Sequence, residues 1–212
     1  MKNLLTLCAS AAISLIAVIP TAGPSAAQDA GLYAKPIDPN SAFVRVISPG
    51  SSIASVKGSS FSGLTDGVSP YVAVDPGDVT VSSSLTNARV EAGAGKFYTA
   101  ILTQSGAKTV MDDMSTNPAK ASLTLYNLSD AADAAVFVPQ AKSEAISKVE
   151  SGNAKTVALR APLKLDLVVK VAGKDVADLK TVEFKRGSGM TVVLTGSGGS
   201  LSAVAVPSTI AR

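Results

Sequence analysis

The pair Ser105 and Lys108 has the spacing of a serine nucleophile and its lysine base. In enzymes that use such a pair, the serine opens a helix that brings the lysine back beneath it, one turn away. Here Ser105-Gly106 follows a run of strand-forming residues and predicts a turn between two strands. A chain this rich in serine and lysine produces such matches by chance, so we expect no acyl-enzyme chemistry from this pair.

A group of oxygen-bearing side chains follows at Asp112, Asp113, Ser115 and Asn117. Such side chains are ligands that calcium prefers, but the segment lacks the glycine and the distal glutamate of a hand-type loop. The alternative interpretation, a solvated linker, is favoured because the step from Asn117 to the following proline is poorly suited to a helix. We predict no metal and no cofactor.

Two glycine runs, at 187–189 and 196–199, invite comparison with loops that cradle phosphate groups. Those loops need a following helix, whose N-terminal amides face the phosphate, and usually a lysine and a hydroxyl at fixed spacing. A predicted strand follows each run instead. We therefore interpret both as tight turns between strands.

The residue types on which most hydrolytic and acyl-transfer sites depend are missing. The chain has no histidine, and its single cysteine is Cys8. Without an imidazole or a second thiol, a serine triad with histidine, a cysteine redox pair and a zinc site of the common ligand types are excluded. Carboxylate, lysine or tyrosine side chains could still form an active site, but they offer fewer kinds of catalytic group. We expect a protein that is not an enzyme.

The N-terminus has the pattern of an export signal. Lys2 supplies a positive charge, residues 4–19 form a mostly apolar run, and Ser25-Ala26-Ala27 is a small-residue cleavage site. A membrane anchor is the alternative, but the run is shorter than the roughly 20 apolar residues that span a bilayer. We expect residues 1–27 to be removed as a signal peptide, with cleavage near Ala27, and the protein to reach the periplasm.

Charge and composition narrow the choice of partners. Removal of Lys2 leaves 18 basic and 16 acidic residues, which are spread along the chain without clusters. A nucleic-acid-binding surface requires a basic patch, so we expect no nucleic-acid partner. Sparse charge with abundant Ser, Thr, Ala, Val and Gly is typical of an exported all-β protein.

The first half of the processed chain predicts one small sandwich. An extended lead, 28–40, is stiffened by prolines, and a first domain follows at 41–114. Short runs rich in β-branched and aromatic residues alternate there with turn residues, and seven short strands fit a sandwich. The predicted strands are 42–47, 53–56, 71–74, 78–83, 89–92, 97–103 and 108–111.

The same pattern restarts in a second domain, 121–212, after a linker at 115–120. Its predicted strands are 122–127, 134–138, 144–149, 156–160, 163–171, 181–184, 190–195 and 201–206. The segment 143–150 could instead be helical, because Ala145, Ile146 and Val149 have helical spacing, but Gly152-Asn153 and the flanking strands favour a hairpin.

The two halves resemble each other in their opening strands and in the Gly-X-Gly that precedes 97–103 and 190–195. This indicates a duplicated unit of roughly 80 to 90 residues. The expected fold class is all-β, with two tandem small antiparallel β-sandwich domains after a cleaved signal peptide.

Aromatic residues are few. Sugar-binding sandwiches usually present flat aromatic side chains to their ligand, but Tyr71, Tyr98 and Tyr126 fall on strand positions that we expect to point into a core. Tyr33, in the lead, is the exception. Leu32 and Tyr33 are therefore our candidate docking residues for a partner protein. A strand pinned to the first sandwich explains them equally well.

The order of these features resembles the AlgF family of periplasmic alginate O-acetylation proteins. Five stretches carry the resemblance, in the expected order and spread over nearly the whole processed chain. They are Ala30-Gly31-Leu32-Tyr33-Ala34, 41–46, Leu125-Tyr126-Asn127-Leu128-Ser129-Asp130, Leu194-Thr195-Gly196-Ser197-Gly198-Gly199 and Leu201-Ser202.

The resemblance implies a periplasmic accessory protein with two β-sandwich domains. Such a protein would link a membrane-bound O-acyltransferase, which moves acetyl groups across the inner membrane, to periplasmic acetyltransferases that place them on alginate or another exopolysaccharide. Two alternatives remain open. The protein could be a carbohydrate-binding module that holds the polysaccharide during modification, or an enzyme that relays acetyl groups through a serine.

Overall fold

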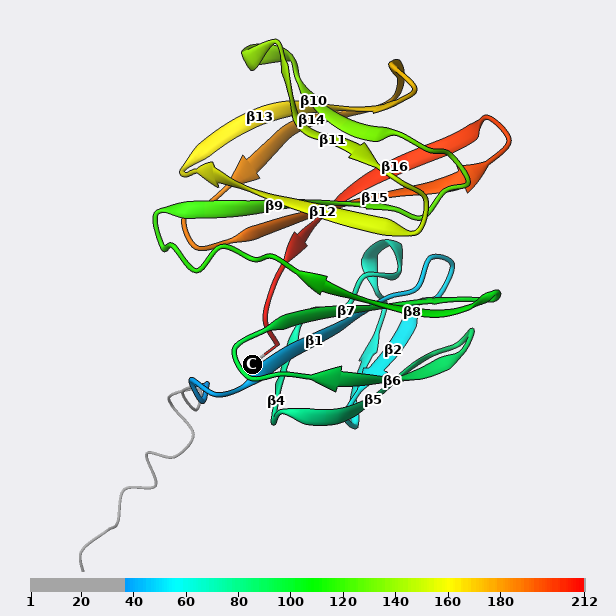
Figure 1. Cartoon of the computed structure of the whole chain (residues 1–212), viewed down its shortest axis with the longest axis vertical. Coiled ribbons are helices and arrows are strands. Elements are labelled where there is room, and N and C mark those ends of the chain that lie inside the picture. The colour runs from blue at the N-terminus through cyan, green and yellow to red at the C-terminus, as the bar shows by residue number, and fades with distance from the viewer. Residues whose placement is uncertain (1–36, 212) are drawn as a thin grey trace, which may run out of the picture. The chain divides into compact units, whose positions relative to one another are not determined.

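Each half of the chain folds into eight strands that form two facing four-stranded sheets (Figure 1). This computed structural model describes residues 37–211. Leu32, Tyr33, Cys8 and the cleavage site near Ala27 lie outside the described residues. Both sandwiches belong to one compact unit of the chain. The expected all-β fold of two small sandwiches is confirmed.

The first sandwich contains β1 to β8 and one short 3-10 turn. The strands are β1 (Ala42–Ile47), β2 (Ile53–Val56), β3 (Ser59–Ser62), β4 (Val72–Val74), β5 (Gly77–Ser83), β6 (Asn87–Ala92), β7 (Phe97–Thr103) and β8 (Gly106–Asp112), and the turn η2 is Thr65–Gly67.

The second sandwich contains β9 to β16 and one further 3-10 turn. The strands are β9 (Lys120–Asn127), β10 (Ala134–Val138), β11 (Ser143–Val149), β12 (Asn153–Arg160), β13 (Leu163–Val171), β14 (Lys174–Phe184), β15 (Gly189–Ser197) and β16 (Ser200–Ser208), and the turn η3 is Pro139–Ala141.

The predicted duplication is present in the strand order. The sheets of the first sandwich run β4-β1-β7-β8 and β3-β2-β5-β6, and those of the second run β12-β9-β15-β16 and β11-β10-β13-β14. Adding eight to each strand number of the first sandwich therefore gives the second. Each unit also contains one parallel pair within its otherwise antiparallel sheets, β1 with β7 and β9 with β15.

Alternation of side chains along each strand builds one core inside each sandwich. Val44 and Val46 of β1 belong to the first core, and Leu123 and Leu125 of β9 belong to the second. β1 and β9 are also buried on their other face. A third apolar cluster covers that face and joins the two sandwiches; its buried members are Ile47, Val68, Ile101, Tyr126, Val193 and Val206.

Two sequence-based expectations about strands were wrong. The first sandwich has eight strands instead of seven, because β3 was missed. Its sequence, Ser-Ser-Phe-Ser, has no apolar alternation, and it is specified by pairing with β2. The segment 143–149 is a strand, as favoured, but it forms no hairpin with β12. It pairs with β10 while β12 pairs with β9, so the turn at Gly152 crosses from one sheet to the other.

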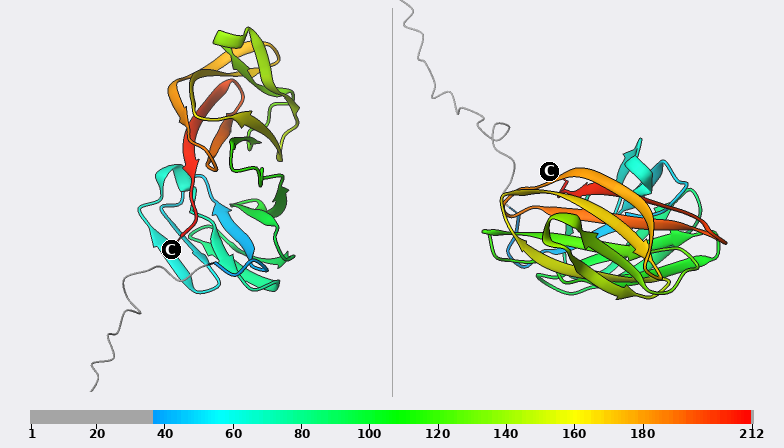
Figure 2. Two further views of the ribbon diagram at one scale, coloured as in Figure 1. Left: turned by 90° about the vertical axis from the view of Figure 1, so that its left-hand side faces the viewer. Right: turned by 90° about the horizontal axis from the view of Figure 1, so that it is seen from above.

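The chain passes between the sandwiches twice. After β8 it runs through residues 113–119 into β9, where the Ser115 amide donates a hydrogen bond of 2.9 Å to the Ser122 hydroxyl. After β16 the C-terminal residues return to the first sandwich (Figure 2, left). There the Tyr71 amide donates to the Thr209 carbonyl at 2.8 Å, and the Ala211 amide donates to the Tyr71 carbonyl at 2.7 Å.

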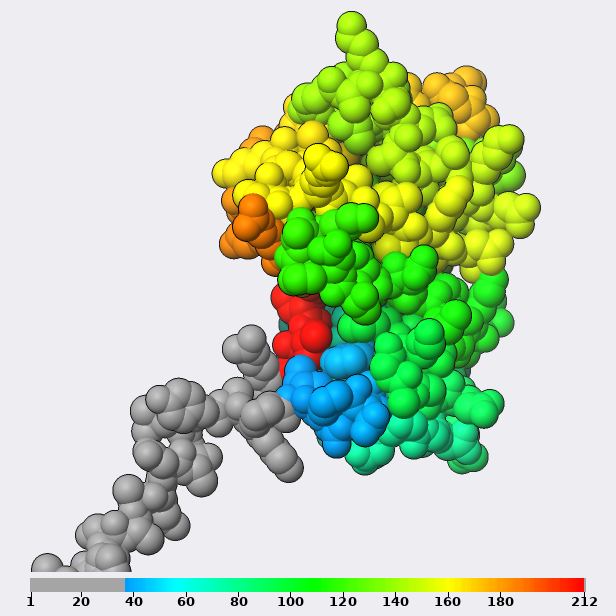
Figure 3. All heavy atoms as spheres, turned by 60° about the vertical axis from the view of Figure 1, so that its left-hand side comes forward, coloured from blue at the N-terminus to red at the C-terminus, as the bar shows by residue number. Residues whose placement is uncertain are grey.

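These C-terminal residues (red in Figure 3) lie on the surface next to the segment that contains the start of the first sandwich (blue). Ile210 forms an isolated parallel bridge with Tyr71, the residue just before β4. No helix among residues 37–211 is long and apolar enough to cross a membrane.

The glycine run 196–199 ends β15 and forms the expected tight turn to β16 at Gly198-Gly199, and a pair of substitutions tests it. A side chain at Gly196 (φ +111°) would collide with the carbonyl oxygen of Ser200, whereas one at Gly198 (φ +58°) would meet nothing. We expect Gly196→Ala to lower the free energy of unfolding by about 3 kcal/mol and Gly198→Ala by only about 1 kcal/mol. Urea unfolding of both variants measures the difference, and equal losses would contradict this account of the turn.

Candidate functional site: the buried joint between the sandwiches

The most concentrated group of polar side chains in the described residues surrounds Arg45, on β1. Its neighbours Val44 and Val46 point into the core of the first sandwich, so Arg45 points out of the other face of the sheet, toward the second sandwich. Its side chain is completely buried. A buried guanidinium needs partners for all its donors, because removing its charge from water costs several kcal/mol.

Hydroxyl groups of the first sandwich connect Arg45 to a buried carboxyl group, that of Asp112 at the end of β8. The Arg45 Nε donates to Thr99 Oγ1 at 2.9 Å, and Thr99 Oγ1 donates to Asp112 Oδ2 at 2.6 Å. The Tyr71 hydroxyl donates to the same Oδ2 at 2.8 Å. The two opposite charges are therefore joined through hydroxyl bridges instead of a direct salt bridge.

The second sandwich supplies the remaining partners. Arg45 Nη1 donates to Thr191 Oγ1 at 2.8 Å and to Ser208 Oγ at 3.3 Å. Arg45 Nη2 donates to the Tyr126 hydroxyl at 3.0 Å, and this hydroxyl in turn donates to Asp112 Oδ1. One guanidinium thus ties β1 to β9, β15 and β16, across the joint.

Aromatic rings cover the flat faces of the guanidinium. Its central carbon lies 4.3 Å from the ring centre of Tyr71 and 5.4 Å from that of Tyr126. The Tyr71 ring packs edge-on against Phe97, at 5.2 Å between centres. Stacking of this kind favours the cation beyond what its hydrogen bonds supply.

Charge and burial shift the pKa values of three of these groups. Burial alone lowers the pKa of Arg45, but the pKa is raised overall because Tyr126, Tyr71 and Asp112 favour the cation. Burial raises the pKa of the Tyr71 hydroxyl well above its usual value, although Arg45 opposes this change. Burial likewise raises the pKa of Tyr126, with Arg45 opposing and Asp112 adding to the increase.

This arrangement is suited to holding the two sandwiches together and offers nothing to a substrate. Arg45, Thr99, Tyr126 and Thr191 are at most 1% exposed. Among the described residues, every buried side-chain nitrogen and oxygen has a hydrogen-bond partner. The group is closed to solvent and none of its polar atoms lacks a partner, so we name it the Arg45 joint and assign it to positioning the two sandwiches.

The expectation of a solvated linker was wrong at Asp112. The structure places this carboxyl group at the end of β8, 6% exposed, and β9 begins only at Lys120. The polar residues that follow made Asp112 look like part of a loop, and the three hydroxyl donors that hold it are far away in the sequence. Among the described residues, no group of acidic side chains is arranged to hold a metal ion.

Sequence reasoning also missed Arg45, although a signal was present. The residue stands alone between Phe43-Val44 and Val46-Ile47, so a charge interrupts an otherwise apolar strand. An arginine in that setting is either paired on a buried face or exposed on a solvated face. The absence of alternating polar residues around it favours the buried face. Tyr71 and Tyr126 are buried as expected, but their hydroxyls serve the joint as well as the core.

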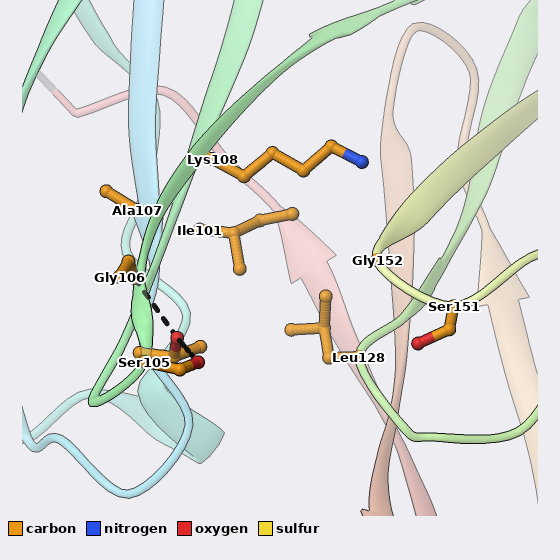
Figure 4. A pocket seen from close by; sticks show the side chains of 9 residues that line it. Ile101, Ser105, Gly106, Ala107, Lys108, Leu128, Ser151 and Gly152 are labelled. Atoms are coloured by element: carbon orange, nitrogen blue, oxygen red, sulfur yellow. Dashed lines mark hydrogen bonds between the residues drawn. The ribbon is translucent and has the colours of Figure 1, made fainter.

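Ser105 lies in the turn of the β7–β8 hairpin, as predicted, and Lys108 follows on β8. Both line a hollow of about 300 Å³ (Figure 4). Leu128, Ser151 and Gly152 of the second sandwich line its other side. The Ser105 hydroxyl lies 2.9 Å from Thr103 Oγ1, and Lys108 Nζ instead donates to Asn153 Oδ1 at 2.8 Å. The two side chains are engaged with different partners, so they form no nucleophile–base pair.

Comparison with known proteins identifies the family. The profile of the family described as "Alginate O-acetyl transferase AlgF" matches residues 14–191. The chain belongs to the AlgF family. The resemblance drawn from the sequence is thereby confirmed, and the AlgF family places this chain in alginate biosynthesis.

Several AlgF relatives match most of the chain. The alginate biosynthesis protein AlgF of Pseudomonas syringae pv. tomato is 27% identical over 99% of this chain and 94% of its own length. AlgF of Pseudomonas aeruginosa is 29% identical, over 84% and 83%. Among solved structures, the C-terminal domain of AlgF from P. aeruginosa is 29% identical and covers 42% of this chain and 98% of its own, with a TM-score of 0.38.

Removal of the cation tests the Arg45 joint. Arg45→Met keeps much of the side-chain volume but leaves the buried Asp112 carboxyl group without its opposite charge. It also removes the donor from four hydroxyl groups, those of Thr99, Tyr126, Thr191 and Ser208. We expect the free energy of unfolding to fall by about 3–5 kcal/mol. The control is Lys57→Met, which breaks the exposed pair Lys57–Asp75 (2.6 Å) and should cost less than about 1 kcal/mol. Similar losses in guanidinium unfolding curves would refute a special role for Arg45.

The raised pKa values of Tyr71 and Tyr126 predict loss of stability in alkali. The stabilising effect is complete below the pKa of an unfolded tyrosine, about 10. Above it the unfolded chain releases protons that the folded chain retains, so stability falls by up to about 1.4 kcal/mol per pH unit for each buried hydroxyl. Tyr126→Phe should reduce this slope between pH 10 and 11.5, measured by urea unfolding at each pH. An unchanged slope would show that this hydroxyl does not titrate as described.

Proposed function

We propose that this protein is a non-catalytic periplasmic adaptor for the O-acetylation of an exopolysaccharide, alginate or an alginate-like polymer. It links a membrane-bound O-acyltransferase to the periplasmic acetyltransferases that modify the polymer. Membership of the AlgF family supports the pathway. The N-terminal pattern of Lys2, an apolar run and a cleavage site near Ala27 supports export to the periplasm.

The Arg45 joint is the observation that carries the non-catalytic role. Acyl transfer needs a nucleophile, a base that activates it and access for the acyl donor. The buried titratable groups of the described residues are consumed in the joint, where each already has its partners. Ser105 and Lys108 are open to solvent but engage Thr103 and Asn153. An adaptor requires only surfaces and a fixed arrangement between them.

The family description names an acetyltransferase, and the residues of this chain support a role beside that reaction. The alternative of a carbohydrate-binding module finds less support. The large apolar side chains exposed in the described part of the chain are Ile37, Ile53, Met111 and Ile210, and none of them is aromatic. The aromatic side chains of residues 37–211 are all buried or half-buried, whereas a sugar-binding platform usually presents exposed rings.

Genetic complementation with two readouts tests the adaptor function. We expect the Ser105→Ala/Lys108→Ala variant to restore polymer acetylation in a deletion strain to the wild-type level, because neither side chain performs chemistry. We also expect the purified wild-type protein to transfer no acetyl group to oligosaccharides from an activated acetyl ester. Multiple turnovers by the isolated protein, or an acetylated serine trapped on it, would overturn the non-catalytic role.

A further inference from the structure

Strand β16 differs from the other long edge strands of the described residues in carrying no charge. Each sheet has two edges, and an edge strand exposes a row of backbone donors and acceptors to any passing strand. Natural proteins usually protect such edges with charged side chains or bulges. The five other edge strands longer than four residues all carry charges; these strands are β6, β8, β11, β12 and β14.

β16 is also the longest of these edge strands to pair with its neighbour without a register shift. Its nine residues pair with β15 without a register shift, from Ser200 to Ser208. β11 and β14, by contrast, contain irregularities that bend an edge away from a partner. Pro207, which lacks an amide hydrogen, is the second-last residue of β16, so residues 200–206 remain able to pair with another strand. Figure 2 (left) shows β16 leading into the C-terminal segment.

Hollows border β16 on both faces of its sheet. The first, about 400 Å³, lies between β16 and the loops 49–52 and 64–67 of the first sandwich, and Ser202 and Val204 line it. We name it the loop-side hollow. The second, about 700 Å³, lies between β16 and β14, and Ala205 and Pro207 line it. We name it the β14-side hollow.

The two hollows match the alternation of side chains in an added strand. Ser202 and Val204 of β16 line the loop-side hollow, whereas Ala205 and Pro207, with the last residue Ser208, line the β14-side hollow. A strand paired with β16 would direct its own side chains alternately to the same two faces. The loop-side hollow offers apolar contacts with Val193, Val204 and Leu64. The β14-side hollow offers charges of both signs, including Lys180 and Glu183. Backbone pairing would supply affinity, and the hollows would supply selectivity.

We propose that the edge of β16 is the docking site for one extended segment of a partner protein. The segment adds a strand beside β16, with small apolar side chains in the loop-side hollow and polar or charged side chains in the β14-side hollow. Loops of the first sandwich line the hollow on one face and β14 lines the hollow on the other, so the surface offered beside β16 matches the two faces of a single extended strand. The inference rests on the proposed function, because it names the surface by which the adaptor holds a partner.

Matched lysine substitutions test this site in the full-length processed protein. Ser202→Lys adds a charge to an exposed position of β16, and Ser60→Lys adds the same charge to an exposed position of the short edge strand β3. Each tagged variant is expressed with the membrane-bound acyltransferase and the periplasmic acetyltransferases, and the amount of each component that co-purifies is measured. We expect about tenfold less of one component with Ser202→Lys and no change with Ser60→Lys. Equal melting temperatures of the two variants establish that both are folded.

A photo-crosslinking residue at position 202 identifies the occupant directly. Crosslinks to consecutive residues of one extended segment of a co-purifying component support the proposal. Crosslinks to a second copy of this chain, or to polysaccharide alone, overturn it. If the wild type and both lysine variants co-purify equally with the components, the β16 site is wrong while the adaptor function stands. If the wild type co-purifies with none of them, the adaptor function fails and the docking site fails with it.

Discussion

A buried guanidinium joined to a buried carboxyl group through hydroxyl bridges holds the two sandwiches of this protein in one arrangement. Apolar contact between Ile101, Val193 and their neighbours removes surface from water, but such contact has no preferred direction. Arg45 adds direction, because its donors meet their acceptors only when the second sandwich is in place. The cost of burying the charge makes other arrangements unfavourable. The joint therefore selects one geometry, and the apolar cluster around it stabilises that geometry.

The duplication explains which faces meet at this joint. Arg45 and Thr99 lie on β1 and β7, and their counterparts by strand order are β9 and β15, which carry Tyr126 and Thr191. Equivalent sheets of the two repeats thus face each other, as the subunits of a symmetric dimer would. The repeats have diverged so that one supplies the cation and the other supplies hydroxyl acceptors. Fusion in one chain allows this asymmetry, because the two faces no longer need to be identical.

This division of the side chains is consistent with a protein that works through its surfaces. The buried titratable groups, Arg45, Tyr71, Asp112 and Tyr126, are all engaged in the joint, while the outer strands carry the features that govern association. Charged residues along β6, β12 and β14 discourage pairing, and β16 lacks that protection. A fixed joint would hold such a surface at a constant orientation to the other faces of the protein. That property suits an adaptor in a multi-enzyme process.

Local pattern determined much of this protein. Runs of β-branched residues with intervening Gly, Pro and Ser predicted most of the strands, because strand and turn preferences act over a few residues. The polar strand β3 was not predicted, because only its pairing with β2 defines it. The sequence also excluded histidine chemistry and a cysteine redox pair by composition. It could not place Asp112 near Arg45, because hydroxyls from five other strands or loops connect or complete the pair. Long-range pairing, including the parallel pair of β1 with β7, decided which side chains meet, and only the tertiary structure contains that information.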